Sequence, residues 1–170
     1  MGHIVSHRTS VQVSGNGLRM AAKFHPVELN EVDFRTLIQA ELSAGREISA
    51  LFLLHGFMEA FLRDWLFYSG VGKPADRSQH VEQKIDRLGC STMIIIHRIL
   101  GNLNDSLFLS ISKINGYRNE LAHNLINENL SNEEFRNRIQ RMVNEGLQTC
   151  EDLHNGYRKA IEIKSREYPS

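Results

Sequence analysis

Residues 46–69 read REISALFLLHGFMEAFLRDWLFYS, and this stretch decides the fold. It contains no proline, and its apolar residues spread over most of the circumference of an α-helix. The apolar set is Ile48, Leu51, Phe52, Leu54, Phe57, Met58, Phe61, Leu62, Trp65 and Leu66. A helix that is apolar on nearly every side has to be surrounded by other helices. The stretch therefore predicts the central helix of an all-α bundle.

Further helices are predicted on both sides of this central one. Before it, a helix is expected to begin at the cap Asn30, with Asp33 three residues later, and to end near Gly45. After it, short helices are expected over residues 78–88 and 91–100. The second of these contains a β-branched run, so a strand is the alternative there.

The C-terminal half supplies the remaining helices. One is expected to start at Asn104 or Asp105, and Ser131 to Glu134 has the form of a capping box that starts a long helix reaching about residue 164. We predict an antiparallel four-to-five-helix bundle over residues 28–166. Residues 1–27 carry serines, glycines and alternating valines, which favour an irregular or short-hairpin N-terminal arm.

Composition narrows the function classes. The 170 residues contain 20 Lys+Arg and 20 Asp+Glu, so the net charge is zero and strong non-specific binding to nucleic acid or anionic membrane is not indicated, although a local basic groove is allowed. Cys90 and Cys150 lie far apart without a CxxC motif, which favours reduced, buried thiols of a cytoplasmic protein. We expect no cofactor, no metal site and no membrane segment.

One charged residue interrupts an apolar stripe. Apolar positions at Leu107, Ile111, Ile114 and Leu121 follow helical spacing, and Arg118 fills the seven-residue gap between the last two. The spacing therefore predicts a buried or half-buried guanidinium, which needs polar partners.

The central helix offers such a partner. His55, Glu59 and Arg63 are spaced four residues apart and form a polar ridge on its surface. We expect the Glu59 carboxylate to pair with Arg118. On spacing alone, such a pair is more often a structural device of a bundle than a catalytic one.

The residues after Arg118 permit a second, chemical interpretation. Asn119 and His123 share a helix face, but Arg118 and His123 point about 140° apart on an ideal helix. If two copies pair through this helix, two arginines and two histidines converge on one cleft. An imidazole can transfer the proton of a ribose 2′-hydroxyl, and a guanidinium can stabilise charge on phosphorus.

The stretch Arg118-Asn119-x-x-x-His123 resembles the R-x4-6-H signature of the HEPN superfamily, and the flanking residues 114–117 are also similar. The resemblance covers about residues 30–163. It implies a homodimeric helical bundle and a metal-independent endoribonuclease of toxin–antitoxin or other defence systems. By that resemblance Arg118 and His123 are catalytic, RNA is the substrate, and an antitoxin or regulatory protein is a possible partner. The supporting residues are Asn119, Glu59, Tyr117 and His55.

A non-catalytic function is the alternative. The Arg-Asn-x-x-Ala-His stretch is also similar to the mannitol operon repressor family, which implies a transcriptional regulator or a protein-interaction scaffold. Arg136, Arg138 and Arg141 form a basic cluster on the last predicted helix, but glutamates interleave with them, so a solvated face is favoured over an RNA track.

Overall fold

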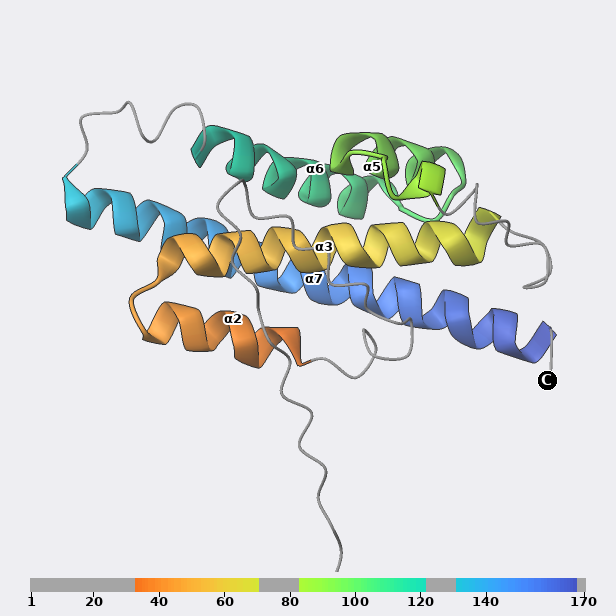
Figure 1. Cartoon of the computed structure of the whole chain (residues 1–170), viewed down its shortest axis with the longest axis horizontal. Coiled ribbons are helices and arrows are strands. Elements are labelled where there is room, and N and C mark those ends of the chain that lie inside the picture. Colours follow the sequence, from red (N-terminus) through yellow and green to blue (C-terminus); the bar gives the residue numbers. More distant parts are fainter. Residues whose placement is uncertain (1–32, 71–82, 122–130, 168–170) are drawn as a thin grey trace, which may run out of the picture.

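The computed structural model describes residues 33–70, 83–121 and 131–167, and it is an all-α bundle, as predicted. These ranges contain helices and no strand. The principal helices are α2 (Phe34–Ser43), α3 (Glu47–Gly70), α5 (Cys90–Ile99), α6 (Asp105–Glu120) and α7 (Asn132–Glu167) (Figure 1). The β-branched run of α5 is helical. The predicted arm, residues 1–27, lies outside the described residues, as do residues 78–82 of the helix expected over 78–88; residues 83–85 of that stretch are helical.

Helix α3 is the centre of the bundle, as its apolar sequence requires. It contacts α2, α5, α6 and α7, and Leu54, Met58, Phe61 and Leu62 are fully buried. The long α7 lies along it, because two glycines of α7 allow a close approach (Figure 1). A Cβ atom at Gly146 would lie 2.2 Å from the Leu54 side chain.

The helix starts follow local capping rules. Ser131 and Glu134 form the predicted capping box: Glu134 N–H donates to Ser131 Oγ at 3.3 Å, and Ser131 N–H donates to Glu134 Oε2 at 3.0 Å. Asn104 caps α6. Asn30, the expected cap, lies outside the described residues, and the helix begins later than predicted, at Phe34. Asp33 caps α2 instead, because its carboxylate accepts both the N–H and the hydroxyl of Thr36.

The helix directions depart from a strictly antiparallel bundle. Helices α2 and α6 run opposite to α3, but α5 and α7 run in the same direction as α3 (Figure 1). Contacts between α3 and α7 show this, since Glu47 meets Arg136 and Trp65 meets Gly156. The chain returns between α3 and α5, so that α5 starts beside the middle of α3 rather than beside its end.

Candidate functional site

Arg118 is exposed, so its predicted burial is wrong. Its neighbours on the stripe behave as expected, with Ile111, Ile114 and Leu121 all buried. Within residues 33–70, 83–121 and 131–167, the Arg118 side chain has no ion pair and no hydrogen bond. The guanidinium is therefore open to solvent and available to an anion.

The exposure of Arg118 has a structural cause. Helix α5 covers α6 only as far as Asn115, whose Nδ2 donates to Ser91 Oγ at 2.9 Å on the first turn of α5. Arg118 lies about one turn further along α6, beyond the first residues of α5. Periodicity places its side chain on the inner face, but α5 begins at Cys90 and its hydrogen bond to α6 is made one turn earlier, at Asn115.

Asn115 also contacts the central helix. His55 is 6 % exposed, and its Nε2 lies 3.1 Å from Asn115 Oδ1. Because the Asn115 amide nitrogen donates to Ser91, its oxygen is left to accept from the imidazole. A continuous hydrogen-bonded chain therefore joins α3, α6 and α5 one turn before Arg118, and it involves Asn115 and Ser91, which the sequence interpretation did not select.

Glu59 does not pair with Arg118, contrary to expectation. Its Oε1 accepts from Arg63 Nη2 at 2.8 Å, and its Oε2 lies 3.8 Å from His55 Nδ1. The predicted ridge thus contains one hydrogen-bonded pair, Arg63 with Glu59, and His55 lies close to the same carboxylate, because spacing of four residues on one helix brings them together without any other element. Glu59 pairs with Arg63, and Arg118 has no carboxylate partner within the described residues.

The charges of Glu59, Arg63 and Arg118 all act on the thiol of Cys90, so the three side chains lie in the same region of the bundle. Burial raises the pKa of the Cys90 thiol to about 12, and the negative charge of Glu59 adds to the rise. The positive charges of Arg118 and Arg63 act in the opposite direction. The thiol stays protonated at neutral pH, so Cys90 is a packing residue rather than a nucleophile. Cys150 is likewise buried and free.

Tyr117 points to a different side of α6. Its hydroxyl donates to Glu145 on α7, and Lys113 Nζ contacts the same carboxylate at 2.8 Å. Lys113 also lies 5.6 Å from the centroid of the Tyr117 ring. Tyr117 therefore joins α6 to α7 and does not line the surface around Arg118.

The remaining predicted site residues are only partly described. Asn119 is exposed beside Arg118. The other predicted catalytic residue, His123, lies outside the described residues.

Two large apolar side chains are exposed near Arg118. Ile48 is 44 % exposed and Phe52 is 50 % exposed. They share one stripe of α3 with His55, since positions three, four and seven residues apart lie on one helix face. Because α6 runs opposite to α3, the part of α3 before His55 lies beside the part of α6 after Asn115, where Arg118 is (Figure 1). These exposed apolar residues thus lie at the same end of the bundle as Arg118.

Neither a metal site nor a membrane-spanning helix is found in the described ranges. No group of three or more His, Cys, Asp or Glu side chains is arranged to hold a metal ion there. None of the helices in these ranges is long and apolar enough to cross a bilayer.

Comparison of the chain with protein-family models, with curated proteins and with solved structures gave no match. The resemblance of residues 118–123 to the HEPN motif therefore stays a prediction made from the sequence.

Proposed function

We propose that this chain is a metal-independent endoribonuclease that acts as a homodimer, with Arg118 and His123 of both protomers in the cleft between them. The observation that carries the proposal is the exposed Arg118 guanidinium, which no carboxylate neutralises among the described residues. An unpaired guanidinium suits a phosphate, because its fork of N–H donors matches two phosphate oxygens. The HEPN-like motif supports the same function.

The exposed apolar residues support the homodimer. Ile48 and Phe52 lie on a face of α3 at the same end of the bundle as Arg118, and burying them against a second copy removes apolar surface from water. Pairing through this face would bring the two Arg118 side chains toward one cleft. That arrangement answers the geometric problem that Arg118 and His123 of one ideal helix point apart.

The proposed chemistry is a transesterification. The imidazole of His123 takes the proton of the ribose 2′-hydroxyl while that oxygen attacks the adjacent phosphorus. The bond between phosphorus and the 5′-oxygen breaks, and this oxygen takes a proton from the second imidazole of the dimer. Arg118 stabilises the negative charge on the phosphoryl oxygens. The products are a 2′,3′-cyclic phosphate and a free 5′-hydroxyl.

The test is an RNA cleavage assay in EDTA with wild type, Arg118→Ala and His123→Ala. We expect cleavage by wild type and a loss of about a hundredfold or more in each variant. Arg35→Ala is a matched control, since Arg35 is an exposed arginine of α2 paired with Glu151 and should keep full activity. Intact RNA at high wild-type concentration, or a fully active His123→Ala, contradicts the proposal.

A non-catalytic interaction module is the second candidate. Exposed apolar residues on the outer side of α5 and α6 favour it, namely Ile95 at 54 %, Ile99 at 78 % and Leu109 at 65 % exposed. Such side chains suit a protein partner, for instance of a transcriptional regulator. Under this function Arg118→Ala leaves every activity unchanged, and substitution of Ile99 by glutamate abolishes partner binding.

A further inference from the structure

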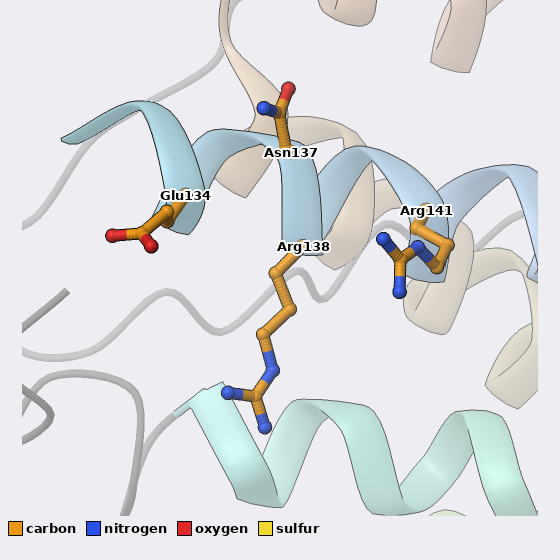
Figure 2. A pocket seen from close by; sticks show the side chains of 4 residues that line it. All are labelled: Glu134, Asn137, Arg138 and Arg141. Atoms are coloured by element: carbon orange, nitrogen blue, oxygen red, sulfur yellow. The ribbon is translucent and has the colours of Figure 1, made fainter. Parts of the chain in front are cut away.

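The first turns of α7 border a shallow hollow of about 340 Å³. Its lining residues are Glu134, Asn137, Arg138 and Arg141 (Figure 2). In Figure 2, Arg138 reaches from α7 to the end of α6, and the Glu134 carboxylate points toward the start of α7, away from both guanidinium groups.

The two arginines of this hollow differ in their partners. Arg138 pairs with Glu120 of α6. Glu134 accepts from the N–H and the hydroxyl of Ser131, and these bonds hold its pKa below the ordinary value. Arg141 is exposed and makes no ion pair within the described ranges. The positive charge of Arg141 helps to lower the pKa of Glu145 one turn along α7, but Glu145 is bonded to Lys113 and Tyr117. The hollow therefore contains one guanidinium without an ion pair among the described residues, and it can accept an anion.

Two cross-helix contacts locate Arg141 relative to α6. Tyr117 reaches Glu145, four residues after Arg141, and Glu120 reaches Arg138, three residues before it. Arg141 consequently lies beside residues 117–120 of α6. This is the same level as Arg118, so two guanidinium groups that make no ion pair with the described residues lie beside the C-terminal half of one helix that is about 10 Å wide.

We propose that Arg141 binds a backbone phosphate of single-stranded RNA, and that the strand crosses the C-terminal half of α6 between Arg141 and Arg118. This inference rests on the proposed ribonuclease function. A polyanion crossing this surface meets Arg118 on one flank and Arg141 on the other. Arg138, held in place by Glu120, lies beside the second contact.

The chemistry of the subsite predicts binding without sequence preference. Tyr117 is the nearest aromatic residue of α6, but its hydroxyl is bonded to Glu145, so it is not free to stack on a base. Guanidinium–phosphate contacts read the backbone and not the bases. These contacts release counterions, so the affinity should fall as salt is added. In a plot of the logarithm of the association constant against the logarithm of the salt concentration, each phosphate contacted on a single strand should contribute about −0.7 to the slope.

The test measures RNA binding apart from cleavage. In a His123→Ala background, the dissociation constant of a fluorescein-labelled, mixed-sequence RNA of about 20 nucleotides is measured by anisotropy at several salt concentrations. We expect Arg141→Gln to weaken binding about tenfold and to lower the salt slope by about 0.7. Glu120→Gln removes a negative charge that pairs with Arg138, so it should tighten binding.

Arg136→Gln is the matched control. It removes the same charge from α7, but Arg136 pairs with Glu47 of α3 on another side of the helix. Its RNA affinity and salt slope should stay at the level of the parent. An equal loss in Arg136→Gln and Arg141→Gln, or unchanged binding by Arg141→Gln, overturns the inference.

The outcomes separate the two proposals. If wild type cuts RNA while Arg141→Gln binds RNA normally, the phosphate subsite is wrong and the ribonuclease function stands. If wild type leaves RNA intact while Arg141→Gln binds RNA more weakly than Arg136→Gln, the ribonuclease function is wrong and the subsite stands.

Discussion

The imidazole of His55 donates to the amide oxygen of Asn115 across 3.1 Å, and this contact sets the position of α6 against the central helix. The Asn115 amide continues the chain to Ser91 at the start of α5. Arg118 follows one turn later on α6. The orientation of the proposed phosphate-binding residue thus depends on a polar network that is itself buried from solvent at His55.

Asn115→Ala should destabilise the protein by about 1–3 kcal/mol, because it leaves the buried His55 Nε2 without an acceptor. The free energy of unfolding in urea measures this cost. Asn119→Ala is the control, since Asn119 is an exposed residue of the same helix, and its stability should change by less than about 0.5 kcal/mol. Equal stability of the two variants contradicts a structural role of the network.

Arg118→Ala should leave the stability within about 0.5 kcal/mol of wild type, because the side chain is exposed and makes no ion pair or hydrogen bond with the described residues. Arg63→Ala offers the comparison. Arg63 is half-buried and donates to Glu59, so its loss should cost about 1 kcal/mol. A large thermal destabilisation of Arg118→Ala would instead support a structural role for this residue.

Much of the fold could be predicted from residues 46–69 and from capping signals. A helix that is apolar all round can only be central, and Ser131 with Glu134 specifies a helix start through local bonds alone. The direction of α5 could not be predicted, because it depends on how the chain returns between α3 and α5, which no periodicity records.

In the candidate site, too, contacts within one helix could be predicted, whereas features that depend on a neighbouring helix could not. The ridge of His55, Glu59 and Arg63 was predictable, since its members contact one another on one helix. The exposure of Arg118 was not, because spacing gives the angle of a side chain around its helix but not how far the neighbouring helix extends. Asn115 carried a signal that could have been used: it directly follows Ile114 on α6 and is polar at the edge of the apolar stripe.

Gly146→Ala should destabilise the bundle, although alanine favours helix by about 1 kcal/mol over glycine. The new methyl group would lie 2.2 Å from the Leu54 side chain in the tightest approach of α7 to α3, and overpacking of this kind costs about 1–3 kcal/mol. Gly116→Ala is the matched test in α6. Nothing lies within 4 Å of its added methyl group, so thermal unfolding should show a gain of about 0.5–1 kcal/mol.

Stability should decline as the pH falls below about 6.5, owing to His154. Burial lowers its pKa, the positive charge of Arg158 adds to the lowering, and Glu151 opposes it. Between pH 6.5 and the lowered pKa, His154 is protonated in the unfolded chain but neutral in the folded one. Folding therefore becomes less favourable as the pH falls through this range.

His154→Phe isolates that contribution. The ring stacks on Phe61 at 4.7 Å between centroids, and its Nε2 has no hydrogen-bond partner, so phenylalanine fits the site without leaving a polar atom unsatisfied. Urea unfolding between pH 7 and 5 should show a shallower dependence in the variant. The residual slope belongs in part to His97, whose pKa burial also lowers. An unchanged slope contradicts the assignment to His154.

Phe52→Glu should convert the proposed homodimer to a monomer and abolish RNA cleavage together with it. Phe52 is half exposed and lies on α3 at the same end of the bundle as Arg118, so a charge there must be desolvated when the two copies meet. Sedimentation equilibrium gives the oligomeric state. Ile99→Glu is the control: Ile99 is 78 % exposed on α5, and its substitution should leave a cleaving dimer. If Ile99→Glu dissociates the dimer and Phe52→Glu does not, the two copies pair through α5, the Arg118 side chains do not share a cleft, and catalysis across the dimer is wrong.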